Sequence, residues 1–266
     1  MTLRAMHSAA SGMQANEFNL DTIANNLANA GTTGFKRTRA NFEDLFYQYL
    51  KIPGAKDANS KLAPLGVGVG LGTRVAGTAI DFTQGSPRLT GNDLDVAIMG
   101  EGFFQVNDGA EILYTRAGAF SINAEGELVV ASGSRGRVLE PAITIPAGTT
   151  NITISAAGIV LALTPPQTAP QEVGQIQTVT FINPQGLLQR GENLFSQTDS
   201  SGAPLQGQPG LEGRGDLQSG SLEMSNVEPV KELIELIKTQ RNFELNSQVV
   251  QAADQLLQQI ANLRRF

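Results

Sequence analysis

Apolar residues recur at every third or fourth position from residue 230 to residue 263, the longest helical pattern in the chain. No Gly or Pro follows Pro229, so nothing interrupts a helix beyond it. Two helix starts are open: a capping box of Ser225 and Glu228, or a cap at Glu228 with Pro229 as the first helical residue. The pattern predicts a helix within residues 225–266, about 55 Å long at about 1.5 Å per residue. The apolar stripe consists of Val230, Ile234, Ile237, Leu245, Val249, Ala252, Leu256, Ile260 and Leu263, with Arg241 in its one gap.

Residues 1–30 carry a second stripe of the same spacing, which predicts a helix that ends at Asn29-Ala30-Gly31. Gly31 suits the left-handed conformation that terminates many helices. The stripe consists of Leu3, Met6, Ala10, Met13, Leu20, Ala24 and Leu27, with Glu17 at its one polar position. We expect the two terminal helices to pair. Two arrangements stay open: a pair packed on the body of its own chain, or helices packed mainly against other copies.

The segment between the helices has a residue pattern that predicts strands and turns. Residues 35–80 predict an arm, in which residues 42–50 fit either helical spacing or an extended chain. Residues 54–66 have the composition of a loop. Gly66, Gly68, Gly70 and Gly72 alternate with apolar residues, which predicts a strand whose bare face another backbone can approach.

Residues 81–200 predict a β-rich body with two hairpins, 103–106 with 112–115 and 120–122 with 128–130. Further short strands are expected at 143–145, 152–154, 159–163 and 177–182. Residues 201–224 are rich in Gly and Pro and predict an extended return connector. The predicted fold class is α+β: long N-terminal (1–34) and C-terminal (225–266) helices form a coiled-coil-like domain, and the β-rich body is inserted between them.

Composition limits the possible chemistry. A net charge of −6 argues against nucleic-acid binding, and the basic run 36–39 is expected to be solvated. With no Cys and His7 as the one His, a typical zinc or Cys–His site cannot form. We find no Walker, dinucleotide or calcium motif, and predict no enzyme activity, cofactor or metal. Paired carboxylates for glycoside hydrolysis stay open, because 25 acidic residues are available.

The chain shows neither an ordinary secretory signal nor a membrane span, which by itself predicts a cytoplasmic protein.

Several segments resemble the signature of the flagellar rod and hook proteins. The most specific are residues 24–29 (ANNLAN) and 33–37 (TGFKR). The resemblance continues through 102–106, 114–116, 141–146, 191–195, 201–204, 225–227 and 240–244. Within this family the whole chain is most similar to the distal rod branch, on the run 41–45 and the long segment after Pro53-Gly54.

The resemblance implies a structural subunit that polymerises helically into a rigid hollow shaft, which transmits torque from motor to hook. It implies a homo-oligomer that contacts the proximal rod and hook proteins, the ring bushing proteins and the flagellar type III export apparatus. The resulting location is the periplasmic basal body, reached without a cleaved signal, which replaces the cytoplasmic expectation. Alternatives are a proximal rod or hook subunit or, in other classes, a wall-associated hydrolase or an adhesin.

We expect the helix stripes and the family motif to carry subunit assembly. The candidate residues are Leu20, Ile23, Asn25, Asn26, Leu27, Asn29, Gly34, Phe35, Ile237, Gln240, Arg241, Leu245, Val249, Leu256 and Ile260. Buried amides between helices can fix their register, so one hypothesis is that Asn25, Asn26 and Asn29 set the register between subunits. The alternative is a plain helix end with solvated amides. A second hypothesis is that residues 46–75 lie across neighbouring subunits and stiffen the shaft.

Overall fold

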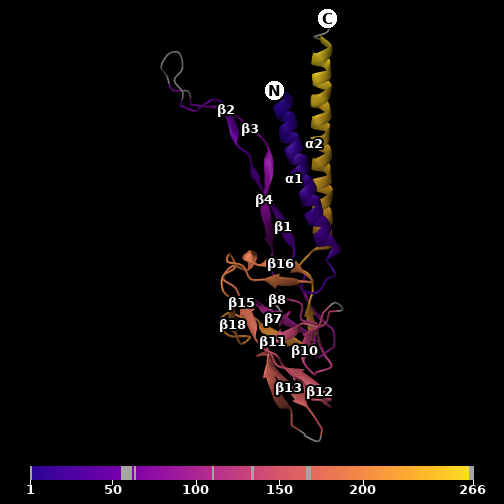
Figure 1. Cartoon of the computed structure of the whole chain (residues 1–266). Helices are drawn as coiled ribbons and strands as arrows, with labels where there is room; N and C mark the ends of the chain where they lie inside the picture. Colours follow the sequence, from indigo (N-terminus) through magenta and orange to yellow (C-terminus); the bar gives the residue numbers. More distant parts are fainter. Residues whose placement is uncertain are drawn as a thin grey trace. The chain divides into compact units, whose positions relative to one another are not determined.

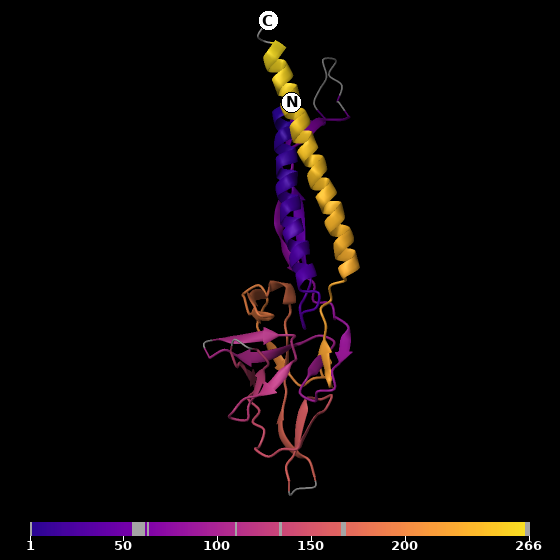
Figure 2. The same cartoon turned by 90° about the vertical axis from the view of Figure 1, so that its right-hand side faces the viewer.

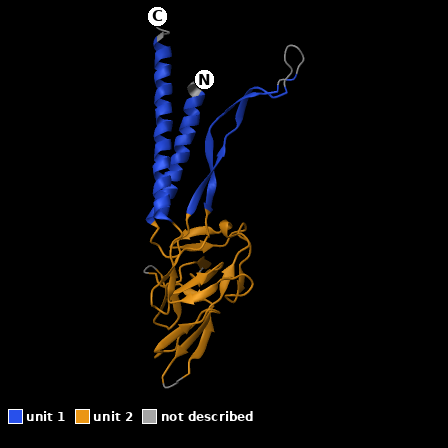
Figure 3. Ribbon diagram, turned by 180° about the vertical axis from the view of Figure 1, so that it is seen from behind, with its two compact units in different colours: residues 1–28, 38–79, 228–266 blue, residues 29–37, 80–227 orange. Residues whose placement is uncertain are grey.

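The computed structural model describes residues 2–54, 62, 64–109, 111–132, 135–165 and 169–263. The chain forms two compact units (Figure 3). Unit 1 contains residues 1–28, 38–79 and 228–266, and unit 2 contains residues 29–37 and 80–227. Both chain ends thus belong to one unit. The chain combines two long helices with a strand-rich segment between them, so the α+β prediction is confirmed. Neither helix, over the residues described, has an apolar stretch long enough to cross a membrane.

Unit 1 combines two long helices with two strand pairs. Helices α1 (Thr2–Ala28) and α2 (Pro229–Leu263) run side by side in opposite directions (Figures 1 and 2). The strands are β1 (Thr38–Asp44), β2 (Tyr47–Lys51), β3 (Val67–Gly70) and β4 (Thr73–Ile80), and they pair as β1–β4 and β2–β3. Of the two alternatives for residues 42–50, the chain adopts the extended one.

The helix ends differ in part from the prediction. Helix α2 starts at Pro229, and the N–H of Glu232 donates to the carbonyl oxygen of Glu228 at 3.1 Å. The capping box was wrong, because the Ser225 hydroxyl accepts from the N–H of Val227 at 3.2 Å instead. Helix α1 ends at Ala28.

A turn follows α1. Gly34 is the one residue of this turn whose backbone adopts the left-handed conformation, with a φ of +70°. The prediction that Gly31 terminates α1 in this conformation was therefore wrong. Gly34 is the residue that needs to be Gly, because a Cβ there would lie 2.7 Å from the backbone nitrogen of Ala117.

The glycines of β3 are contacted by aromatic rings rather than by a second backbone. In the antiparallel β2–β3 pair, Tyr49 lies opposite Gly68 and Tyr47 opposite Gly70. A Cβ added to Gly68 would lie 3.0 Å from the Tyr49 ring. The bare face predicted from the Gly pattern therefore exists, and cross-strand tyrosines cover it.

Unit 2 is built from short strands. They are β5 (Pro87–Leu89), β6 (Val96–Met99), β7 (Phe103–Asn107), β8 (Ile112–Thr115), β9 (Phe120–Ile122), β10 (Leu128–Val130), β11 (Val138–Glu140), β12 (Asn151–Ile154), β13 (Ile159–Leu163), β14 (Gln171–Gln175), β15 (Thr178–Thr180), β16 (Leu188–Gly191), β17 (Leu194–Ser196), β18 (Leu205–Gly207), β19 (Asp216–Ser219) and β20 (Ser221–Glu223). A 3-10 turn, η1, spans Pro184–Gly186.

The largest sheet of unit 2 runs in the order β16-β17-β8-β7-β11-β10-β9, with β15 paired to both β7 and β18. Strands β12-β13-β14 form a second sheet. The predicted hairpins are present as the antiparallel pairs β7–β8 and β9–β10. Residues 201–224, expected as a connector, contribute β18, β19 and β20, which pair with β15, β6 and β5.

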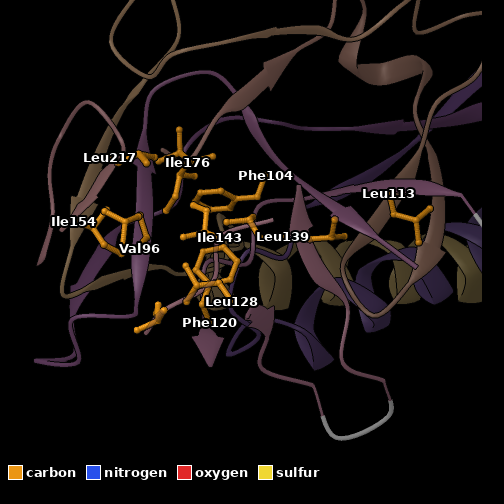
Figure 4. Close-up of a cluster of buried hydrophobic side chains, with 14 of the residues drawn as sticks. Val96, Phe104, Leu113, Phe120, Leu128, Leu139, Ile143, Ile154, Ile176 and Leu217 are labelled. Carbon is orange, nitrogen blue, oxygen red and sulfur yellow. The ribbon is translucent and has the colours of Figure 1, made fainter. Parts of the chain in front are cut away.

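The core of unit 2 consists of aliphatic and aromatic side chains from most of these strands (Figure 4). Phe104 packs edge-on against Phe120 with ring centroids 5.1 Å apart. A second cluster surrounds Phe103, Phe181 and Phe195.

Candidate assembly surface

Helices α1 and α2 meet along a seam of polar and small residues. Three contacts define it: Asn26 Nδ2 lies 3.3 Å from Glu232 Oε2, Asn19 Nδ2 lies 3.0 Å from Thr239 Oγ1, and Gly12 faces Asn246. A Cβ at Gly12 would lie 2.8 Å from Asn246 Nδ2. Each contact is seven residues from the next on both helices, and each pair of residue numbers adds to 258. The seam is therefore antiparallel, with one register along its length.

The seam uses a different face of α2 from the one that the sequence predicts. Among the side chains described in α2, Glu232, Thr239 and Ala253 are buried. The apolar stripe stays largely exposed: Val230 is 70% exposed, Leu245 58% and Ile260 57%, and Leu245 lines a groove with Gly12 and Ala15 of α1. The other exposed members are Ile234, Ile237, Val249, Ala252 and Leu256, and Gln240 and Arg241 beside them are exposed too. The side chain of Leu263 lies outside the described residues.

The stripe of α1 lies beside the seam rather than in it. Of the α1 side chains that the structure describes, Ala9, Ala15, Ile23 and Asn26 are buried. The large stripe residues are half-buried at the edge of the seam: Met6, Met13, Leu20 and Leu27. The smaller stripe residues Ala10 and Ala24 are exposed, as is Glu17, and the side chain of Leu3 lies outside the described residues. The prediction that the helices pair is confirmed, but the prediction that they pair through these stripes was wrong.

Asn26 joins three elements of unit 1. Its Nδ2 donates to the Thr38 carbonyl oxygen at 2.8 Å and lies 3.3 Å from Glu232 Oε2, and its Oδ1 accepts from the Thr38 N–H at 2.9 Å. The side chain is 1% exposed. Its amide is thus used inside the chain, where it holds the end of α1 to the starts of β1 and α2. A register role of Asn26 between subunits stays a prediction, while its amide has a role within the chain.

The other two asparagines of the motif are placed differently. Asn25 is exposed on α1. Asn29 is half-buried, and its Oδ1 accepts from the Thr32 hydroxyl at 3.2 Å in the turn after α1. Phe35, in the same motif, is half-buried. The three amides therefore do not act as one set.

Unit 2 contains a buried ionic cluster around Glu223. Lys36 Nζ lies 2.7 Å from Glu223 Oε1 and donates to the Thr83 carbonyl oxygen at 2.7 Å. Arg116 Nε lies 3.1 Å from Glu223 Oε2, and the Gly85 N–H donates to Oε1 at 2.9 Å. The Lys36 and Glu223 side chains are 0% and 1% exposed. The expectation that the basic run 36–39 is solvated was therefore wrong for Lys36.

Burial dominates the electrostatics of this cluster. Desolvation lowers the pKa of Lys36 below its ordinary value, and the charge of Glu223 opposes this shift only in part. Burial likewise lowers the pKa of Arg116, again against the attraction of Glu223. The guanidinium of Arg116 also donates to the carbonyl oxygens of Gly102 at 2.7 Å and Gly100 at 2.9 Å. The cluster is thus a buried structural junction, in which Glu223 Oε2 has the Arg116 ion pair but no hydrogen bond.

Asn226 extends the junction towards the chain that leads into α2. Its Oδ1 accepts from the Arg37 N–H at 2.7 Å, and its Nδ2 donates to the Asp81 carbonyl oxygen at 2.8 Å. The Gly34 N–H donates to the Glu223 carbonyl oxygen at 2.8 Å. Residues 33–37, 80–86 and 223–227 are therefore tied together by polar contacts.

Comparisons with known proteins bear on the same segments. Residues 6–36 match a family model described as flagella basal body rod protein. Residues 97–162 match the flagellar hook protein FlgE/F/G D1 domain, and residues 218–263 match the C-terminal part of the flagellar basal body rod FlgEFG proteins.

Full-length relatives extend the match. The flagellar basal-body rod protein FlgG of Caulobacter vibrioides is 44% identical over 98% of this chain and 100% of the relative. The FlgG of Borreliella burgdorferi is 45% identical over 99% of both chains. The hook-basal body complex protein FlhP of Bacillus subtilis is 31% identical over 98% of this chain and 100% of the relative.

The chain belongs to the flagellar basal-body rod protein family. It is a structural component of the flagellar basal body. The N-terminal match of this rod protein ends at Lys36, and the C-terminal match begins at residue 218, five residues before Glu223. The buried ionic cluster thus lies where both matched segments of the rod protein meet in unit 2.

Sequence reasoning missed Lys36, Arg116, Glu223 and Asn226 as a group. A signal was available, since Lys36 and Arg116 lie in quoted family segments and Asn226 follows Ser225 in another. Glu223 had no such signal. Its burial depends on the β20–β5 pairing, which places Glu223 opposite Pro87.

The strand pair β2–β3 presents a second apolar surface of the rod protein. Phe46 beside it is 88% exposed. The other exposed apolar residues of this surface are Tyr47, Tyr49, Leu50, Ile52, Leu65, Val67 and Val69. Residues 55–61 and 63, which join the two strands, lie outside the described residues. Exposed apolar residues in this number are typical of protein interfaces.

Unit 2 also contains a cavity of about 310 Å³ beside the Phe103 cluster. Its walls include Phe82, Phe103, Phe181 and Arg116, with Glu101 as the one carboxylate among the lining residues described. All three nitrogens of the Arg116 guanidinium already contact Glu223, Gly100 or Gly102. The cavity therefore does not present the pair of carboxylates that glycoside hydrolysis uses.

Proposed function

We propose that this rod protein polymerises helically into the distal rod, a rigid hollow shaft that transmits torque from the motor to the hook. The observation that carries the proposal is the unpartnered apolar stripe of α2. Seven large apolar side chains of this stripe, among the residues described, are 45–70% exposed. A helix keeps such a stripe when another surface covers it.

The stripe supplies a sizeable free energy of association. Burying the exposed part of one such side chain contributes on the order of 1 kcal/mol, so the whole stripe contributes roughly 5–10 kcal/mol per subunit. The polar seam between α1 and α2 adds little, because hydrogen bonds of this kind contribute about 1 kcal/mol each. We therefore expect the helix pair to be marginally stable in the free subunit and well ordered in the polymer. Limited proteolysis of the subunit and of isolated basal bodies compares these two states.

The proposal is tested by removing the stripe. In a triple variant, Ile234, Leu245 and Leu256 are each replaced by Ser. We expect the purified subunit to keep its β-sheet circular dichroism, while cells that carry the variant fail to complete the rod and lose motility. Electron microscopy of isolated basal bodies measures rod completion.

A matched control separates stripe burial from helix propensity. Gln251, Gln255 and Gln258 are exposed polar residues of α2 outside the stripe, and replacing all three by Ser introduces three weaker helix formers. We expect the control to build complete rods. Complete rods in the stripe variant would refute the proposal.

We propose further that the β2–β3 arm lies across neighbouring subunits and stiffens the shaft. The exposed apolar residues of this arm, with Phe46 the most exposed, support the idea. Deleting residues 54–66, most of which lie outside the described residues, shortens the tip of the arm. We expect bent or fragile rods in electron micrographs. Straight rods of normal length would contradict this role.

Family membership supports the remaining proposals. The subunit is exported by the flagellar type III apparatus without a cleaved signal and reaches the periplasmic part of the basal body. There it contacts copies of itself, the proximal rod and hook proteins and the ring bushing proteins. Mass spectrometry of the subunit from isolated basal bodies tests export without cleavage, since an intact N-terminus is expected.

A further inference from the structure

The apolar stripes of α1 and α2 match each other step by step in the register of the helix seam. In that register, two residues lie at the same level when their numbers add to 258. The stripe residues pair within one residue of this rule. The pairs are Met6 with Ala252, Ala10 with Val249, Met13 with Leu245, Leu20 with Ile237, Ala24 with Ile234, and Leu27 with Val230.

The single charged position of each stripe falls at the same level. Glu17 is the polar member of the α1 stripe and Arg241 that of the α2 stripe, and their numbers add to 258. Both side chains are exposed, and neither has an ion pair within the described residues of the chain. One stripe therefore presents a negative charge where the other presents a positive charge.

The two stripes cannot cover each other inside one chain. The seam of Asn26–Glu232, Asn19–Thr239 and Gly12–Asn246 already occupies the facing sides of the helices. Most of the α2 stripe and the exposed part of the half-buried α1 stripe are thus left for contacts with other copies. Because they are different surfaces, each contact between them leaves one unused stripe on either side, and such a heterologous contact propagates into a polymer.

We propose that the α1 stripe of one subunit packs against the α2 stripe of its neighbour, with Glu17 paired to the neighbour's Arg241. The inference rests on the proposed polymerisation and adds its partner surface and register. In this register the six apolar pairs face each other and the two charges neutralise each other. A shift by one step places Glu17 against Ile237 or Leu245 and leaves both charges buried without partners, which is strongly unfavourable.

Charge reversal tests the pairing. We expect Glu17→Arg alone or Arg241→Glu alone to lower the number of completed rods at least tenfold. Co-expression of the two single variants should restore rods to within about threefold of the native level. In an alternating polymer, the arginine introduced at position 17 faces the glutamate introduced at position 241 of a neighbour, and at the next contact native Glu17 faces native Arg241. A pairing inside one chain would not be rescued by this mixture.

Cysteine cross-linking tests the register directly, because the chain has no native Cys. One tagged subunit carries Met13→Cys and another carries Leu245→Cys, and both are co-expressed. After mild oxidation of isolated basal bodies, we expect a disulfide between the two different subunits. The control pair combines Met13→Cys with Ile234→Cys, which lies 11 residues, or about 16 Å, from the matched level. A disulfide needs Cβ atoms within about 4.5 Å, so the control should give none.

The outcomes separate the two proposals. Two outcomes would overturn the register while leaving polymerisation intact. One is a cross-link through the control pair in complete rods, and the other is a failure of the two co-expressed charge variants to restore rods. Native subunits that are absent from isolated rods would overturn the proposed function itself.

Discussion

Replacing Lys36 by Met is the sharpest test of the buried ionic cluster. Met keeps most of the apolar length of the side chain and removes the charge. Glu223 Oε1 then retains the Gly85 N–H at 2.9 Å as a donor but loses the ammonium group at 2.7 Å. Arg116 Nε stays 3.1 Å from the other carboxylate oxygen. The carboxylate is left with less compensation in a site that solvent does not reach.

The expected loss of unfolding free energy is about 3 kcal/mol. Removing one partner of a buried pair costs about 3–5 kcal/mol when the other charge is left without a counterion, and the lower end applies here because Arg116 still faces the Glu223 carboxylate. The lost hydrogen bond to the Thr83 carbonyl oxygen adds about 1 kcal/mol. The lowered pKa of Lys36 acts in the opposite direction, since it shows that burial disfavours its charged form. The net loss therefore lies near the lower end of the range.

Urea unfolding measures this loss. The chain has no Trp, so Tyr fluorescence and far-ultraviolet circular dichroism follow the transition. With a slope of about 2 kcal/mol per molar urea, a loss of about 3 kcal/mol moves the midpoint down by about 1.5 M. The control is Arg190→Met in the same unit, because the Arg190–Glu111 pair is 48% and 47% exposed. Exposed pairs contribute about 0–1 kcal/mol. Equal midpoints for the two variants would refute the reasoning and place Lys36 in solvent.

Three further predictions concern single positions. Asn26→Leu removes the partners of the Thr38 N–H and carbonyl oxygen, so we expect a loss of about 2–3 kcal/mol in urea unfolding followed by helix signal; native stability would contradict it. Gly34→Ala should lower the melting temperature well below that of the control Gly31→Ala, because Gly34 has a φ of +70° and no room for a Cβ, whereas Gly31 has open space. Because the pKa of Lys36 is lowered on folding, the unfolded chain binds more protons between that pKa and 10.5, so stability should rise with pH there. The rise of unfolding free energy with pH should be smaller in Lys36→Met. Equal slopes in the variant and the native protein would contradict the prediction.

Much of the fold could be predicted from local patterns. The terminal helices, the β7–β8 and β9–β10 hairpins and the alternation of Gly in β3 follow from periodicities that the backbone geometry imposes over a few residues. The seam between the helices could not be found this way. Its residues, such as Asn19, Thr239 and Gly12, are polar or small, and an apolar stripe is the stronger signal.

The role of charged residues could not be predicted either. Lys36 stands in a basic run that resembles a solvated surface, and only the convergence of residues 83–86, 116 and 223 around it removes water. Asn26 was identified as a candidate, but its partners Thr38 and Glu232 come from separate segments. A side chain's partners are a property of the folded chain, because distant segments supply them.

The sequence by itself determined the two terminal helices, two of the hairpins, the fold class, the absence of cysteine chemistry and, through its motifs, the rod family. It also carried both apolar stripes, with Glu17 and Arg241 at their polar positions. Only the tertiary structure decided which helix faces pair within one chain and which stay free. Helix periodicity places residues on a face, but the neighbour of that face depends on packing between segments more than 200 residues apart, such as Asn26 and Glu232.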